Sequence, residues 1–284
     1  HVTGDLNAAW NRALSDGSVA ANDMRLFYPL LEHDARAITR VSLVSDRAGH
    51  YIASGARGEK VLTQQTHHGN KATFVPERLR DALLQGPHIG VATPFAQEPN
   101  EIVTSHSDWS PVNAECLDPK YVPRSLVYEL PTSRMPAANS TVAYSVAFRT
   151  FVDPGNARSL FASILPHDVV LDGITAVKMH TLANTVRFAG LCSSILFDNL
   201  LRFAQASSVT LSLLSTFPWP TRHNRVDGWL ALRTLRLNCV TEHFKDAWDG
   251  AFEPSWQHDT FTDIRTPSRL NDVGPVWSRS TPLR

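Results

Sequence analysis

The sequence predicts a mixed α/β fold, in which a long helix packs on a mixed sheet, and three stretches predict it. From 142 to 148 large apolar residues occupy every second position, which is the period of a β-strand. From 189 to 205 the apolar spacing becomes three and four residues, the period of a helix with one buried face. The same helical spacing returns at 229–248. The hydrophobic content of 43% is sufficient to build a core between these elements.

The predicted elements of the middle of the chain lie between residues 142 and 220. A half-buried strand is expected at 142–149, followed by a turn at 153–156 and two further strands at 158–166 and 169–179. A long helix is expected at 189–205, and a short element at 211–220 ends in an aromatic–proline step. In the first strand Arg149 lies on the face opposite Phe148, because side chains alternate across a strand.

On either side of this region the pattern is weaker. Near the start of the chain we expect short helices at 7–14 and 23–37 and a hairpin over 41–53. Further on we expect a short helix at 76–84 and then an extended connector to residue 136, because the many prolines there interrupt regular strands.

These differences divide the chain into four parts, with the best boundary at 135–140. Residues 1–73 form an N-terminal region of unclear fold, and residues 74–136 form a proline-rich connector. Residues 137–226 form a central domain, and residues 227–284 form a C-terminal helix with its tail. A length of 284 residues allows one large domain or two of ordinary size, and we expect the chain to be part of a longer parent protein.

The composition limits the classes of function. Lysine and arginine (27) equal aspartate and glutamate (27), so the formal net charge is +0 and any DNA-binding surface must be a local basic face. The cysteines Cys116, Cys192 and Cys239 are far apart, and we expect buried free thiols at the last two, in a reducing compartment. The sequence shows no long apolar run and no signal peptide, which favours a cytoplasmic protein without membrane contact.

The sequence lacks the usual catalytic signatures. It has no Gly-x-Gly turn, no Pro-Pro pair, no Walker loop, no Gly-x-Ser-x-Gly elbow and no Glu-x-Lys pair. Twelve histidines are present, but they do not have the spacing of metal ligands. We therefore expect no catalytic residue, no metal and no cofactor in this chain.

Several short motifs follow one another in the middle region. They are Ala147-Phe148-Arg149, residues 158–166, Ser194, Phe197-Asp198, Leu201-Arg202 and Phe217-Pro218. In order and spacing they resemble the target-recognition domain of large bacterial adenine DNA methyltransferases. That group includes type IIG restriction–modification enzymes and the methylases of BREX and phage-growth-limitation defence systems, and type I specificity subunits share the second half of the pattern more loosely.

Further segments resemble the same group. They are Gly-Pro-His-Ile-Gly-Val-Ala-Thr-Pro-Phe at 86–95, the segment 118–124, the helical run 232–248 and the tail from Trp277. The residues after Arg124 depart from the group's pattern, since Ser-Leu-Val-Tyr replaces Thr-Asn-Tyr. The resemblance covers residues 74–284. It implies a chain that reads DNA sequence for an adenine methyltransferase domain of the parent protein, and that domain would bind S-adenosylmethionine.

A DNA reader needs polar side chains that reach base edges and phosphates. Polar residues on the predicted loops around the strands and helices are the candidates: Arg149, Asn156, Arg158, Lys178, His180, Asn184, Gln205, Ser207, Ser208, Thr210, Arg222, His223 and Arg225. We assign the basic loop 222–225 to phosphates. The expected partners are double-stranded DNA, the methyltransferase domain of the same parent chain and other defence-system proteins.

Other interpretations of these residues stay open. Arg149 can pair with Asp153 instead of DNA, and Asp198 and Arg202 have the four-residue spacing of an ion pair within a helix. The loop 222–225 can simply be solvated. The rival function is a protein-interaction module that docks members of a defence complex through exposed tryptophans: Trp229, Trp248, Trp256 and Trp277.

Overall fold

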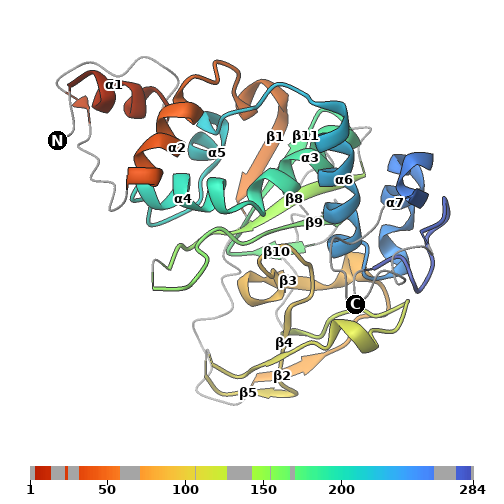
Figure 1. The fold of residues 1–284 in the computed structure, drawn as a ribbon. Helices are drawn as coiled ribbons and strands as arrows, with labels where there is room; N and C mark the ends of the chain where they lie inside the picture. Colours follow the sequence, from red (N-terminus) through yellow and green to blue (C-terminus); the bar gives the residue numbers. More distant parts are fainter. Residues whose placement is uncertain are drawn as a thin grey trace.

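The computed structural model describes residues 4–13, 23–24, 32–57, 71–105, 107–126, 143–153, 155–166, 170–258 and 273–282. Its centre is a four-stranded antiparallel sheet in the order β1, β11, β8, β9 (Figure 1). These strands are Ile52–Arg57, Ile174–Met179, Tyr144–Arg149 and Ala162–Pro166. Helices and an antiparallel sheet in one fold confirm the predicted mixed α/β class.

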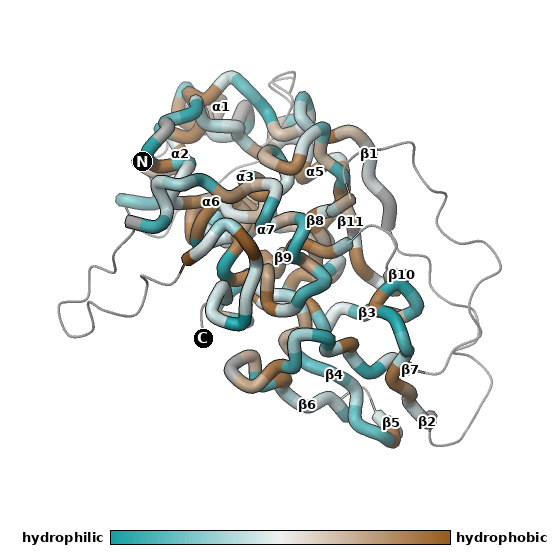
Figure 2. Tube along the Cα trace, turned by 90° about the vertical axis from the view of Figure 1, so that its right-hand side faces the viewer, coloured by the Kyte–Doolittle hydropathy of each residue, from teal (hydrophilic) through white to brown (hydrophobic). Residues whose placement is uncertain are grey.

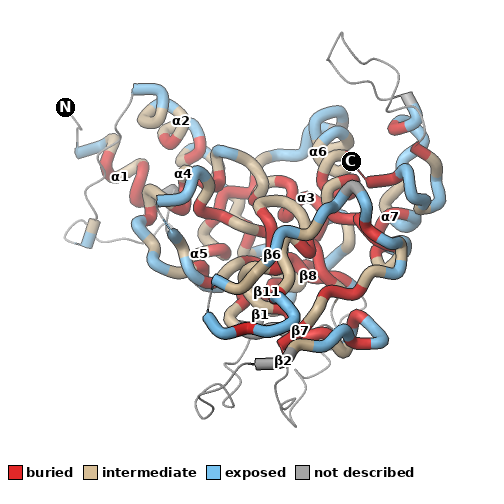
Figure 3. Tube along the Cα trace, turned by 90° about the horizontal axis from the view of Figure 1, so that it is seen from below, coloured by how far each residue is buried: buried red, intermediate tan, exposed pale blue. Residues whose placement is uncertain are grey.

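Strand β8 lies in the interior of the sheet, with β11 on one side and β9 on the other. Residues Tyr144 to Phe148 are all buried, so Ser145 and Ala147 are covered as well as the large residues that alternate with them. The hydrophobic and buried residues concentrate on this part of the fold (Figures 2 and 3). The expectation of a half-buried strand is therefore wrong, because both faces of the sheet are covered.

The predicted third strand divides at Gly173. This glycine has a φ of 66°, a left-handed conformation that residues with a Cβ rarely adopt. Before it, β10 (Val170–Asp172) pairs in parallel with β3 (Leu83–Gln85), and after it β11 joins the central sheet. The segment 169–179 thus supplies strands to two different sheets.

The predicted long helix also divides. Helix α3 runs from Leu182 to Cys192 and α4 from Ile195 to Phe203. Ser194 caps α4, because its side-chain oxygen accepts a hydrogen bond from the amide of Phe197 at 3.2 Å. The apolar spacing of 189–205 therefore belongs to the end of one helix and the whole of the next.

The proline-rich segment folds into a lobe of short strands below the central sheet (Figure 1). Its strands, besides β3, are β2 (Lys71–Phe74), β4 (Gln97–Pro99), β5 (Ile102–Val103), β6 (Trp109–Pro111) and β7 (Ser125–Leu126). Single 3₁₀ turns lie between them at Leu79–Asp81, Gly86–His88 and Ala114–Cys116. The expected helix at 76–84 and the expected extended connector are both wrong. The proposed boundary at 135–140 lies outside the described residues.

The remaining helices surround the sheet. At the N-terminal side are α1 (Gly4–Ala13) and α2 (Glu32–Ser42), followed by a 3₁₀ turn at Ala48–Tyr51. Later come α5 (Leu211–Thr216), α6 (Asn224–Asn238), α7 (Lys245–Ala251) and 3₁₀ turns at Glu242–Phe244 and Pro254–His258. The expected helix near 7–14 is present as α1. The expected hairpin over 41–53 and the single helix over 229–248 are wrong, because α2 reaches Ser42 and α6 stops at Asn238.

Candidate nucleic-acid interface

Helices α3 and α6 pack side by side and run in the same direction. The Nε of Arg187, in the middle of α3, donates to Asp227 Oδ1, in the first turn of α6, at 2.9 Å. One turn further along α3, a Cβ on Gly190 would lie only 2.8 Å from Leu230 Cγ of α6. Later residues of α3 thus meet later residues of α6, so the two N-termini lie at the same end of the sheet. Each N-terminus carries about half a positive charge from the helix dipole.

Some of the candidates from the sequence lie at this common end. We define the basic end as His180, Asn184, Arg222, His223 and Arg225. The Arg222 Nη2 donates to Asn184 Oδ1 at 3.1 Å, which joins the loop before α6 to the first turn of α3. The guanidinium of Arg225 stacks on Trp229, 4.5 Å from the ring centre. Among the described residues, no carboxylate forms an ion pair with Arg222 or Arg225.

Local capping explains why the two helices begin where they do. The Thr181 Oγ1 accepts from the Asn184 amide at 3.1 Å, so it caps α3 directly after the exposed His180. The His223 ring accepts from the Val226 amide at 3.5 Å and caps α6. Capping satisfies one amide of each first turn, and other amides of those turns remain directed at the space outside the helix.

A buried arginine, Arg187 of α3, binds both the loop before α6 and α6 itself. Arg187 is 6% exposed, and its Nη2 donates to the carbonyl of Pro220 at 2.7 Å. Its guanidinium also lies 4.9 Å from the centre of the Trp219 ring, and Tyr51 stacks on that ring at 4.4 Å. Asp227, the partner of Arg187, accepts from the His223 amide at 2.8 Å. These contacts fix both sides of the loop that carries Arg222.

One carboxylate, Asp46, lies beside this cluster. Its oxygens accept from the Tyr51 hydroxyl at 2.6 Å and face the His50 Nδ1 at 2.7 Å. Burial alone would raise the pKa of Asp46, but the hydrogen bonds from Tyr51 and His50 outweigh it and lower the pKa below its ordinary value. Asp46 is therefore ionised at neutral pH, and its charge is directed at these two side chains.

Other candidates lie at the opposite end of the sheet. Because β8 and β11 are antiparallel, Arg149 at the end of β8 lies opposite Ile174, far from His180 at the end of β11. The loops that follow β8 and α4 carry the polar candidates of this end: Asn156, Gln205, Ser207, Ser208 and Thr210. Lys178 lies near the end of β11, two residues before His180, and is paired with Ser54 of β1. The topology thus separates the candidates into two groups.

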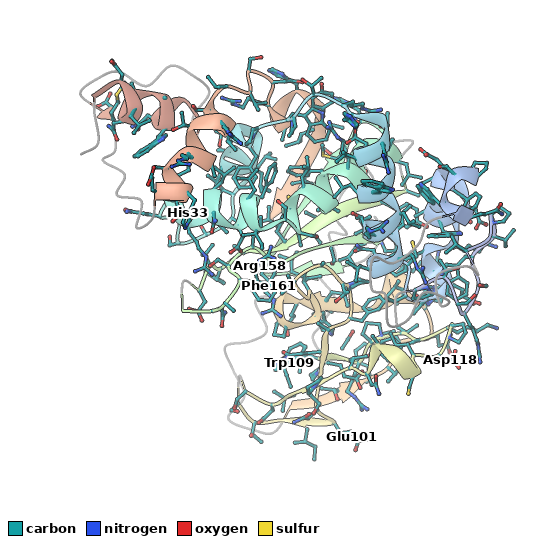
Figure 4. All side chains as sticks on the ribbon, in the orientation of Figure 1. His33, Glu101, Trp109, Asp118, Arg158 and Phe161 are labelled. Atoms are coloured by element: carbon teal, nitrogen blue, oxygen red, sulfur yellow. The ribbon has the colours of Figure 1, made fainter. Side chains whose placement is uncertain are left out.

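Arg149 and Arg158 are used inside the fold. The Arg149 Nε donates to the carbonyl of Ile89 at 2.7 Å, and its guanidinium lies 4.1 Å from the centre of the Phe161 ring. Burial lowers the pKa of Arg149. The Arg158 Nη2 donates to the carbonyls of Ser193 and Ser194 at 3.0 and 3.1 Å, and Figure 4 shows Arg158 and Phe161 at the end of the sheet away from the start of α6. The geometry favours structural roles for both arginines over DNA contacts.

The carboxylate of Asp198 in α4 binds both Arg202 of the same helix and the backbone before β9. Its Oδ2 accepts from the Arg202 Nε at 3.1 Å, which confirms the ion pair within α4. Its Oδ1 accepts from the amides of Ser159 and Leu160, each at 2.7 Å. Burial would raise the pKa of Asp198, but these amide hydrogen bonds and the nearby Arg158 charge lower it. The Phe197-Asp198 motif thus anchors the start of β9.

Motifs far apart in the sequence also meet through Asn238. Its Oδ1 accepts from the Ile164 amide at 2.7 Å, and its Nδ2 donates to the carbonyl of Ala92 at 3.1 Å. Arg236, two residues earlier, holds the C-terminal segment through the carbonyl of Thr281 at 2.9 Å. The motif residues that carry the family resemblance therefore join the lobe, the sheet and α6.

Sequence reasoning missed four residues of this arrangement: Tyr51, Arg187, Trp219 and Asp227. The predicted helix began at residue 189, so Arg187 lay outside it. Its apolar neighbours Val186 and Phe188 were the available signal, because a charged residue among apolar ones needs a partner. Its partners lie 33 and 40 residues away in the sequence, so spacing alone could not identify them.

The described residues contain no group of His, Cys, Asp and Glu side chains that could hold a metal ion. Over the same part of the chain, the helices are too short or too polar to cross a lipid bilayer. Cys192 and Cys239 are buried free thiols, as expected, and Cys116 is exposed.

No protein-family model, no curated protein and no solved structure shows a significant match to this chain.

Proposed function

We propose that this chain binds double-stranded DNA through the basic end and recognises a short sequence for an adenine-specific DNA methyltransferase. Two findings support the proposal. The order and spacing of the motifs resemble target-recognition domains, and the basic end collects exposed cationic side chains at two helix N-termini. The methyltransferase domain, its S-adenosylmethionine and any cleavage activity would belong to the parent protein.

The parallel arrangement of α3 and α6 is the observation that carries the proposal. Backbone amides and the positive ends of two helix dipoles converge with Arg222 and Arg225, and phosphate oxygens are the ligands such groups favour. Arg225 is also placed in the first turn of its own helix, where a cation is unfavourable unless an anion compensates it. A DNA phosphate provides that anion.

The balanced net charge is compatible with this function. Affinity for DNA depends on the phosphates that are contacted, and a formal charge of +0 does not prevent a local basic surface. A surface with few phosphate contacts suits a domain that works beside another DNA-binding domain of the same parent chain. In this proposal the protein acts in the bacterial cytoplasm and marks host DNA within a restriction–modification or phage-defence system, with other defence proteins as further partners.

The rival function receives less support from the geometry. Trp248 and Trp256 are 0% and 3% exposed, so two of the four tryptophans assigned to protein docking belong to the core. Trp277 donates through its Nε1 to the carbonyl of Cys239 at 2.7 Å, which holds the tail in place. Trp229 is 43% exposed, but its ring stacks with Arg225 at the basic end.

A salt titration tests the proposal. Fluorescence anisotropy of a labelled duplex of mixed sequence is measured with the purified chain, with the double variant Arg222→Glu/Arg225→Glu, and with the control Arg80→Glu/Lys120→Glu. The control changes the net charge equally, at exposed positions of the lobe. Glutamate in the first turn of α6 is favourable for the helix, so the double variant should fold.

We expect the affinity of the unmodified chain to fall steeply with salt. If Arg222 and Arg225 each contact one phosphate, the double variant should lower the slope of log affinity against log salt by about 1.8, at about 0.9 per contact. The control should retain the original slope. Binding that does not depend on salt, or equal loss in both double variants, would contradict the proposed interface.

A further inference from the structure

The loops at the end of the sheet opposite the basic end form a second surface. A β-bridge joins Phe151 to Ser208, and the Val152 amide donates to the carbonyl of Ser207 at 3.2 Å. The loop after β8 and the loop after α4 therefore lie side by side with fixed backbones. We define the tip as Phe151, Asn156, Gln205 and Ser207.

Phe151 is the large apolar residue of the tip. Phe151 is 72% exposed, although the chain on both sides of it is held by backbone hydrogen bonds, such as that from the Val209 amide to the Thr150 carbonyl at 2.7 Å. A large apolar side chain that stays in water on a rigid backbone forgoes the gain of burial, and such positions commonly mark contact sites. The exposed face of this ring is suited to an apolar group of a ligand.

The same two loops carry two exposed carboxamide residues, Asn156 and Gln205. Arg202 connects them: its Nη2 donates to the carbonyl of Asn156 at 2.7 Å, and its own carbonyl accepts from the Gln205 amide at 3.0 Å. Gln205 has a φ of 49°, a strained conformation for a residue with a Cβ, and it is exposed. Within the described part of the chain, no partner engages the carboxamide of Asn156 or of Gln205.

We propose that the tip reads an adenine–thymine base pair in the major groove. This inference rests on the proposed function and adds the base that is read. An Asn or Gln carboxamide matches the N7 acceptor and N6 donor of adenine, and a phenylalanine ring suits the methyl group of thymine. The tip carries both types of group on two adjoining loops. Among the described side chains near it, Arg158 and Arg202 are bound to carbonyls and to Asp198 and are therefore not free to read guanine.

The distance between the basic end and the tip is close to half a turn of a DNA duplex. Strand β8 has 6 residues, which spans roughly 20 Å. Half a turn of B-form DNA advances roughly 17 Å along its axis. A duplex that lies along the strands can thus place a phosphate at the basic end and a major-groove edge at the tip.

The test combines changes in the DNA with changes in the protein. First, sequencing of the duplexes that the chain retains from a randomised pool defines the preferred site. A duplex of that sequence is then compared with analogues in which deoxyuridine replaces thymidine, which removes only the methyl group, or 7-deazaadenine replaces adenine, which removes the N7 acceptor. Each duplex is titrated with the unmodified chain, with Phe151→Ala, with Asn156→Ala/Gln205→Ala, and with the control Ile102→Ala, an apolar residue 57% exposed in the lobe.

We expect one adenine–thymine position at which 7-deazaadenine weakens binding roughly 5- to 150-fold. This loss should be absent in Asn156→Ala/Gln205→Ala, and the smaller loss caused by deoxyuridine should be absent in Phe151→Ala. The control variant should respond to both analogues like the unmodified chain. The analogue responses of the unmodified protein identify the base pair that is read, and the responses of the variants show whether the tip reads it.

Two other outcomes are distinguishable. A chain that retains no duplex at any salt concentration contradicts the proposed function itself. A chain that binds duplex DNA, but whose sequence preference and analogue responses are the same in all the variants, leaves the proposed function intact and overturns the role of the tip.

Discussion

In the described part of the chain, several charged side chains bind backbone groups of distant segments. Arg149, Arg158, Arg187 and Arg236 each donate to at least one backbone carbonyl from another part of the chain. Asp198 accepts from two backbone amides in the same way. A guanidinium group can satisfy several carbonyls at once, so these residues link segments whose backbone is not paired in a sheet. Sequence patterns show that such residues are present but not which carbonyls they meet.

His88 illustrates the same principle in the lobe. Its Nδ1 accepts from the Gln85 amide at 2.9 Å, so in the neutral ring the Nε2 carries the proton and donates to the carbonyl of Arg124 at 3.1 Å. Complete burial lowers the pKa of His88 to about 4. A second proton, on Nδ1, would face the Gln85 amide and remove that hydrogen bond.

This geometry predicts a loss of stability in weak acid. The unfolded histidine has a pKa of about 6.5, so the unfolded state binds more protons than the folded state as pH falls from about 6.5 to 4. Stability from this group is fully present above that window and decreases through it, by about 2 kcal/mol between pH 7 and pH 5. Urea denaturation at both pH values, on the unmodified chain and on His88→Gln, measures it.

The variant provides the control. His88→Gln lowers stability at pH 7 because it disturbs a packed site, but it removes the titrating group. The unmodified chain should therefore lose about 2 kcal/mol more than the variant between the two pH values. If both proteins lose the same amount, His88 does not titrate with a lowered pKa and the account of its hydrogen bonds is wrong.

For helices and strands, the hydrophobic period predicted that an element is present better than it predicted the residues at which the element begins and ends. The strand over 144–149 and the apolar helical run near 200 were predicted from the sequence, and both are present. The breaks at Gly173 and Ser194 were missed, although local signals mark both of them: Asp172-Gly173 is a turn dipeptide, and Ser194 is a helix N-cap residue. The apolar residues on either side of each break were assigned to a single element. The lobe was missed because its strands have only two to four residues, too few to show a period.

Two glycines test the packing of α3 against α6. A Cβ on Gly190 would contact Leu230 Cγ at 2.8 Å and would also meet the Thr234 hydroxyl, so the helices approach closely at that point. A Cβ on Gly228 would be 3.6 Å from Glu253 Oε2, an ordinary contact distance. We expect Gly190→Ala to destabilise by about 1 to 3 kcal/mol through overpacking. Gly228→Ala should stabilise by about 0.5 to 1 kcal/mol, because alanine is the better helix former.

Thermal or chemical denaturation of both variants measures these changes. The two substitutions add the same methyl group to neighbouring helices, so each is the control for the other. Opposite signs are the expected result. Equal effects of one sign would mean that α3 and α6 are not packed at Gly190, and the parallel arrangement that forms the basic end would lose its main support.

For the whole molecule, the fold arranges the sequence candidates into one group at each end of the sheet. The basic loop 222–225 was identified from its composition, and the structure places it beside Asn184 and His180. Its separation from Asn156 and Gln205 was not predictable, because it follows from the antiparallel pairing of β8 and β11. The same topology determines that a single duplex would have to extend along the strands to contact both groups.

Hydrogen–deuterium exchange of the chain, with and without a saturating DNA duplex, tests the location of that duplex most directly. Bound DNA should slow exchange in the first turns of α3 and α6, at 181–187 and 221–229, and at the tip, at 150–158 and 203–209. Slower exchange confined to the lobe at 71–126, or no change in any segment under conditions of measured binding, would contradict an interface at the basic end.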